Sequence, residues 1–84
     1  MEGLAQQLGK RIKALRQQRG MTQEQLLKSS VRPIKLTRSH LSQIEKGTLH
    51  MQMDTLEIVI QLLHVKPAKL FAGIQVEDIP THIQ

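Results

Sequence analysis

The sequence contains no cysteine, and only one of its 84 residues, Phe71, is aromatic. Without thiols the chain forms no disulfide and offers no thiolate to a metal. Its core must therefore be aliphatic, built mostly from Leu, Ile, Val and Met. The sequence also lacks an apolar run near the roughly 20 residues that span a bilayer, and its N-terminus has no apolar signal-peptide segment. We expect one small cytoplasmic domain with no membrane partner.

The residues that are present favour helices. Leu, Gln and Lys are frequent and β-branched runs are few, a composition typical of all-α proteins. Apolar spacing predicts amphipathic helices at roughly 2–19 and about 53–64, the second with Leu56, Val59, Ile60 and Leu63 on its core face. Capping and stop signals predict three shorter helices, from Thr22 to about Ser29, over about 38–46 and over 67–72. Residues 1–72 then form the domain and 73–84 a C-terminal tail.

The net charge of +5 is unevenly distributed. Residues 1–38 hold nine Lys and Arg residues against Glu2 and Glu24, a balance of +7, whereas residues 54–84 carry −2. A basic half is a candidate surface for a polyanion. Solvated helix faces would show the same excess, so charge alone leaves both interpretations open.

The segment 37–47 is the most informative part of the chain. Thr37 is a helix cap and Gly47 a helix stop, and the only apolar residues between them are Leu41 and Ile44. These two residues can hold one narrow side of a short helix against a core. The rest of the surface is small or polar, with side chains able to hydrogen-bond to bases. The pattern predicts a helix that is held from behind and contacts a partner in front.

The chain resembles the lambda-repressor/Cro-type helix-turn-helix family, also called the XRE family. Five separated stretches carry the resemblance, in the family's order and near its spacing: 12–16, 20–26, 41–47, 54–63 and 70–71. The resemblance implies a five-helix lambda-repressor-like domain with a short C-terminal tail. It also implies binding to double-stranded DNA, usually by a homodimer on an inverted repeat, and transcriptional regulation in a bacterial or phage-type cytoplasm.

Base-reading residues follow from this resemblance. In such domains the recognition helix enters the major groove with its N-terminal residues against base edges. The family positions correspond to Arg38, Ser39 and Gln43, with Ser42 as a weaker candidate. Arg pairs bidentately with guanine and Gln with adenine, so these residue types suit the role.

The family also implies contacts that position the protein. Gln23 corresponds to a residue that touches a phosphate and braces the recognition helix, while Arg16 and Glu45 correspond to a partly buried ion pair between the first and third helices. Further phosphate candidates are basic or hydroxyl-bearing residues near these elements: Thr37, Arg11, Arg32, Lys35, Lys46 and Thr48.

The chain departs from the family between its second and third helices. Ten residues, 27–36, separate Leu26 from Thr37, about four more than the family's usual spacing. This insertion either follows the DNA backbone or is a neutral loop. Two further departures are Gln52, where a Ser or Thr cap is common, and His64, where glycine is common.

Apolar residues left over after the core is filled point to a dimer. They are Ile58, Leu62, Ile74 and Val76. We expect some of them to form a two-fold interface. The alternative is that the tail packs onto its own fourth helix, and residues 74–77 also alternate as a short strand would.

The sequence offers little for catalysis. The four histidines, His40, His50, His64 and His82, have no metal-ligand spacing, and there is no paired-carboxylate site, activated nucleophile or glycine-rich phosphate loop. We therefore expect no enzyme activity, metal, cofactor or small-molecule ligand. The main hypothesis is a sequence-specific DNA-binding regulator, with repression as its simplest action. The rivals are a protein-interaction module on the same fold and the DNA-binding fragment of a longer regulator.

Overall fold

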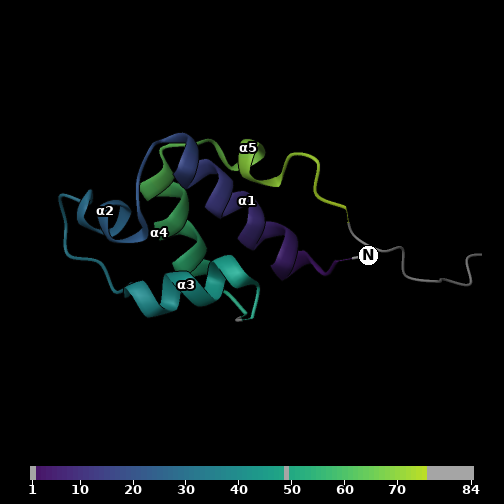
Figure 1. The fold of residues 1–84 in the computed structure, drawn as a ribbon, viewed down its shortest axis with the longest axis horizontal. Coiled ribbons are helices and arrows are strands. Elements are labelled where there is room, and N and C mark those ends of the chain that lie inside the picture. The colour runs from purple at the N-terminus through teal and green to yellow at the C-terminus, as the bar shows by residue number, and fades with distance from the viewer. Residues whose placement is uncertain (1, 49, 76–84) are drawn as a thin grey trace, which may run out of the picture.

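The computed structural model describes residues 2–48 and 50–75, and this part of the chain forms five α-helices and no strand (Figure 1). The helices are α1 (Leu4–Gln18), α2 (Gln23–Lys28), α3 (Arg38–Lys46), α4 (Met53–Leu63) and α5 (Pro67–Phe71). The predicted all-α class and the order of the helices are confirmed, with boundaries displaced by one or two residues. Two residues of the alternation predicted at 74–77, residues 76 and 77, lie outside the described part of the chain.

Local capping chemistry sets the ends of the short helices. At α2, the Thr22 hydroxyl accepts a hydrogen bond from the Gln25 backbone N–H at 3.1 Å, and the Gln25 side chain accepts one from the Thr22 N–H at 2.9 Å. At α3, the Thr37 hydroxyl accepts from the His40 N–H at 3.1 Å. Gly47 ends α3 in the left-handed region, at φ +73°. These caps satisfy backbone groups that a helix end leaves without partners.

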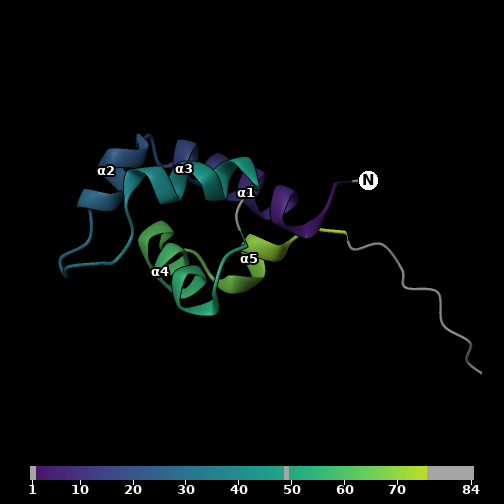
Figure 2. The same cartoon turned by 90° about the horizontal axis from the view of Figure 1, so that it is seen from below.

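The helices enclose one aliphatic core. Ile12 of α1, Leu26 of α2, Leu41 of α3 and Leu70 of α5 are fully buried in it. Figure 1 shows α3 below α1 and α5 above it, with α4 beside α1, and Figure 2 shows α3 and α4 as two separate layers. Leu36, in the connection before α3, is also buried. One side of α3 is therefore committed to the core.

The orientation of α4 differs from the prediction. Its buried residues are Val59, Leu62 and Leu63, whereas Leu56 and Ile60 are only half-buried. Leu62, which we expected on a second, outward stripe, is thus part of the core. Six of the eleven α4 residues are large and aliphatic. Because they surround most of the helix, their spacing does not define a single core face, and packing against α1 and α2 decides it.

The described start of the tail, residues 73–75, contacts α1. The Gln75 backbone N–H donates to the Gln7 side-chain oxygen at 2.9 Å, and the Gln7 amide donates to the Gln75 carbonyl. Ile74 is half-buried against the core. Within the described residues, no helix is both long and apolar enough to cross a membrane.

Candidate nucleic-acid interface

The solvent-facing side of α3 is polar and unobstructed. Leu41 and Ile44 are buried behind it. Arg38, Ser39 and Gln43 are exposed, and Ser42 is half-buried. Residues three and four apart share a helix face, so Ser39 and Gln43 are neighbours on the outward side, with Arg38 at its N-terminal end. The structure therefore brings the predicted base-reading residues together on one accessible surface.

A buried ion pair fixes α3 to α1. The Arg16 guanidinium donates to the Glu45 carboxylate twice, from Nε to Oε2 at 2.7 Å and from Nη2 to Oε1 at 2.9 Å. Both side chains are more than nine-tenths buried. The hydrogen bonds from Arg16 to Glu45 raise the pKa of the guanidinium above its ordinary value, although burial acts to lower it. The carboxylate that stands in an element proposed to face DNA is thus neutralised inside the protein.

The Arg16–Glu45 pair also hydrogen-bonds to α2 and to the turn between α1 and α2. The Gln23 side-chain amide at the start of α2 donates to Glu45 Oε1 at 3.1 Å, and Arg16 Nη1 donates to the Met21 carbonyl at 2.7 Å. Glu45 therefore accepts three hydrogen bonds, and α1, the α1–α2 turn and α2 all meet at α3. Gln23, predicted to contact a phosphate, is engaged in holding α3. Its second amide hydrogen is the one that a phosphate would have to use.

Gly9 is a positioning residue that the sequence analysis missed. It is buried in α1 directly beneath the last turn of α3. A Cβ atom at this position would lie 2.4 Å from the Ile44 carbonyl oxygen and 2.8 Å from that of Glu45. Only glycine allows the two backbones to come this close. A glycine within a helical stretch was the available signal, because it costs helix stability unless packing requires it.

The phosphate candidates are divided between two sides of the molecule. Lys35 and Lys46 are exposed at or beside α3, and Arg32 is exposed in the connection before it. The Thr37 hydroxyl caps α3, and the Thr48 hydroxyl donates to the Gln43 carbonyl at 3.3 Å, so both already have partners within the chain.

Arg11 is placed differently from the prediction. Its guanidinium donates to the Ala72 carbonyl just after α5, on the side of α1 away from α3. The position follows from helical spacing, since Arg11 is two residues from Gly9 and therefore on a nearly opposite face. Lys13, four residues after Gly9 and three before Arg16, is exposed on the α3 edge of α1 and replaces Arg11 as a candidate.

The residues predicted to form a dimer interface are not brought together. Ile58 and Leu62 of α4 line a hollow beside the 29–34 segment, with Leu62 only 5 % exposed at its floor. Ile74 lies instead in a separate hollow against α1. Val76 is outside the described residues. Among the three described residues, Ile58 and Leu62 therefore share one hollow, and Ile74 lies in another.

The described residues contain no group of three or more His, Asp or Glu side chains placed to bind a metal ion. Comparison with known protein families gives a more specific result. A model of the family described as "Helix-turn-helix domain" matches residues 7–71, which is most of the chain. The chain belongs to the helix-turn-helix domain family. The match agrees with the predicted XRE-type resemblance and covers all five helices except the first turn of α1. Comparisons with curated proteins and with solved structures found no match to this helix-turn-helix domain.

Proposed function

We propose that this helix-turn-helix protein binds double-stranded DNA sequence-specifically through α3 and regulates transcription as a homodimer on an inverted repeat, most simply as a repressor. The observation that carries the proposal is the division of α3 into a fixed side and a free side. Leu41, Ile44 and Glu45 are buried, while Arg38, Ser39 and Gln43 are exposed. In a helix-turn-helix domain the exposed side of this helix is the surface that enters the major groove, so the family match supports a base-reading role for these side chains.

In the proposed complex, different residues supply specificity and affinity. Arg38 and Gln43 hydrogen-bond to base edges in the major groove, and Ser39 and Ser42 make shorter contacts there. Lys35, Lys46 and Lys13 neutralise phosphates, which adds affinity and salt dependence without sequence choice. Arg16, Glu45 and Gln23 act on DNA indirectly, because they fix the position of α3.

Selection of bound duplexes from a random pool, followed by gel shifts at several salt concentrations, tests the proposal. We expect Arg38→Ala or Gln43→Ala to lose about 1–3 kcal/mol of discrimination at one base position. Two matched controls lie away from α3: Lys66→Ala removes one positive charge before α5, and Gln18→Ala removes one glutamine at the end of α1. Both controls should keep the sequence preference.

The rival function is a protein-interaction module that has lost DNA binding. The hollow between α4 and the segment before α3 supports this rival, because it offers an apolar floor to a partner. Absence of DNA binding at low salt by the native chain would contradict the main proposal and favour the module.

A further inference from the structure

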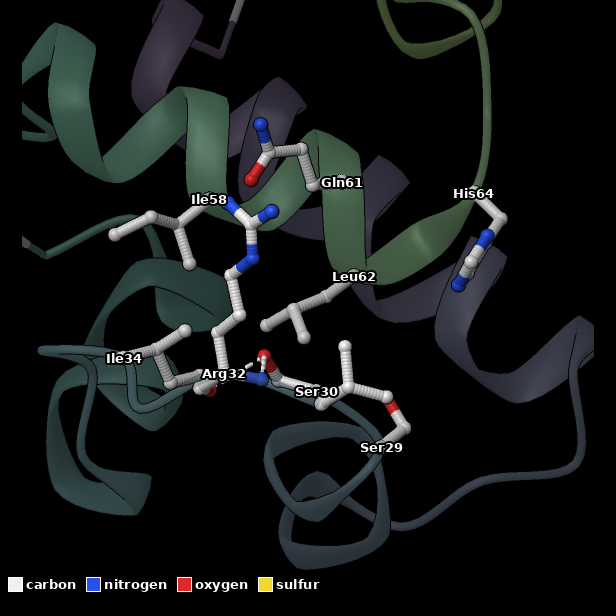
Figure 3. Close-up of a pocket in the computed structure, with 9 residues that line it drawn as sticks. Ser29, Ser30, Arg32, Ile34, Ile58, Gln61, Leu62 and His64 are labelled. Carbon is white, nitrogen blue, oxygen red and sulfur yellow. Dashed lines mark hydrogen bonds between the residues drawn. The ribbon is translucent and has the colours of Figure 1, made fainter.

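A groove runs between α4 and the connection formed by residues 29–36 (Figure 3). It consists of two adjoining hollows of about 330 and 560 Å³ that share Ser30, Arg32, Ile34, Ile58 and Gln61. Leu62 also lines the smaller hollow, and its side chain points from α4 toward the connection (Figure 3). This α4 groove exists because of the insertion before α3, since its outer wall is the inserted connection.

A fully exposed apolar side chain stands at the edge of the α4 groove. Val31 lines the smaller hollow and is 98 % exposed, more than any other large apolar residue in the described chain. It therefore buries almost nothing against its own chain. An exposed apolar side chain beside a groove with an apolar floor is a self-complementary arrangement, because the side chain of each copy can fill the groove of the other.

The charges beside the α4 groove are also self-complementary. Arg32 and Lys35 lie on the connection, while Asp54 lies on the facing wall of α4. Glu57 follows Asp54 by one turn on the exposed side of α4. None of these four side chains forms an ion pair among residues 2–48 and 50–75, where the pairs are Lys10–Glu2, Arg16–Glu45 and Lys28–Glu24.

We propose that the α4 groove binds a second copy of this chain, with Val31 of each copy inserted into the groove of the other. The inference rests on the homodimer in the proposed function and names its interface. In a two-fold dimer every contact between the copies occurs twice, so the Val31 side chains of both copies are buried. The same rotation sets Arg32 against the acidic wall of the partner's α4, and Lys35 stays available to a phosphate. Arg32 is exposed, so its side chain is free to turn from its own α4 toward the other copy.

This interface determines how the two reading helices are aligned. The connection leads directly into Arg38 at the start of α3, so the N-terminal ends of both α3 helices lie nearest the two-fold axis. Bases contacted by Arg38 and Ser39 would then be closer to the centre of the operator than bases contacted by Gln43. An interface through the C-terminal tail carries no such requirement.

Sedimentation equilibrium of the full chain tests the valine contact. Val31→Asp should raise the dimer dissociation constant about a hundredfold, because two buried valines are lost from each dimer. Met53→Asp is the matched control, since Met53 is 76 % exposed but does not line the groove. Val31 supports no internal packing, so at a concentration where both chains are monomeric the variant should unfold at the native temperature. An unchanged dimer constant for Val31→Asp, or a native chain that stays monomeric, would overturn the proposal.

Charge reversal tests the occupant of the groove. Arg32→Glu and Asp54→Lys should each weaken self-association, because each creates like-charged pairs on both sides of the axis. In a dimer of one variant with the other, one of the two symmetric contacts between positions 32 and 54 has its charges exchanged, and the other is the native Arg32–Asp54 pair. Mass spectrometry of an equimolar mixture should therefore show the mixed dimer well above the twofold excess over either homodimer that random pairing alone would give. The random 1:2:1 distribution of homodimer, mixed dimer and homodimer would contradict the proposed alignment.

Two further measurements separate the possible failures. A chain that ends at residue 75 should dimerise as the native chain does, whereas a changed dimer constant would assign the groove to the tail and overturn the proposal. Val31→Asp should still shift a short random-sequence duplex at low salt, since its α3 surface is unaltered. If the native chain dimerises through Val31 but shifts no DNA, the proposed function fails while the interface stands.

Discussion

The contact of α3 with α1 and the groove between α4 and the connection have opposite properties. At the α1–α3 contact, the Glu45 carboxylate accepts three hydrogen bonds. Gly9 lets the backbones of α1 and α3 come so close that no Cβ atom would fit between them. At the α4 groove, charged side chains have no ion-pair partners among the described residues, and a valine is almost fully exposed. The difference shows that this small domain holds α3 firmly against α1 and leaves the groove between α4 and the connection open to a partner.

The largest effect should come from removing one member of the buried pair. Glu45→Ala leaves the Arg16 guanidinium buried without its carboxylate, and we expect a loss of about 3–5 kcal/mol in the free energy of unfolding. Urea denaturation measures the loss. Glu24→Ala is the control, because it removes only the exposed Glu24–Lys28 pair and should cost less than about 0.5 kcal/mol. Equal losses for the two variants would show that the buried pair is not a special support of α3.

A second, smaller loss of stability should follow from placing a side chain where Gly9 lets α1 and α3 come close. Gly9→Ala places a Cβ atom against the carbonyl groups of Ile44 and Glu45, and neither carbonyl can rotate away as a side chain would. We expect a net loss of about 1–3 kcal/mol, even though alanine is the better helix former. Gly3→Ala, where a Cβ atom would meet nothing within 4 Å, is the matched control. A stabilised Gly9→Ala protein would contradict the close contact.

The cap of α3 should contribute less than either of these. Thr37→Ala removes the hydroxyl that accepts from the His40 N–H and should cost about 1 kcal/mol. Because Arg38 and Ser39 occupy the turn that this cap stabilises, hydrogen exchange of the first α3 amides should also accelerate. Thr37→Ser keeps the hydroxyl and should restore both values, so an equal loss in the two variants would exclude capping as the cause.

The smallest effect should be found at the α4 groove. Arg32→Ala removes an exposed arginine with no ion-pair partner in the described chain, and the unfolding free energy of the monomer should change by less than about 0.5 kcal/mol. The measurement is urea denaturation at a concentration where the chain is monomeric. A loss close to that of Glu45→Ala would remove the contrast between the two regions.

Helix identities and short-range caps were predictable from the sequence because they depend on neighbouring residues. Thr22 and Thr37 cap the helices expected of them, and Leu41 and Ile44 are the buried stripe of α3. The exposed positions of Arg38, Ser39 and Gln43 followed from the same spacing.

Features that depend on how helices meet were not predictable from spacing alone. Leu62 is in the core because α4 is apolar on most sides, so its rotation is set by its neighbours. The close approach at Gly9 and the contact of Arg11 with Ala72 join residues distant in sequence. The α4 groove likewise arises only when the inserted connection folds against a helix that follows it by some twenty residues.

The three hydrogen bonds that the Glu45 carboxylate accepts have a thermodynamic consequence for the proposed DNA complex. Because α1, α2 and α3 are already joined at this carboxylate, the reading surface exists before DNA arrives and few backbone groups need to be ordered on binding. The heat-capacity change of association should therefore scale with the contact area alone, without the larger negative contribution that accompanies coupled folding.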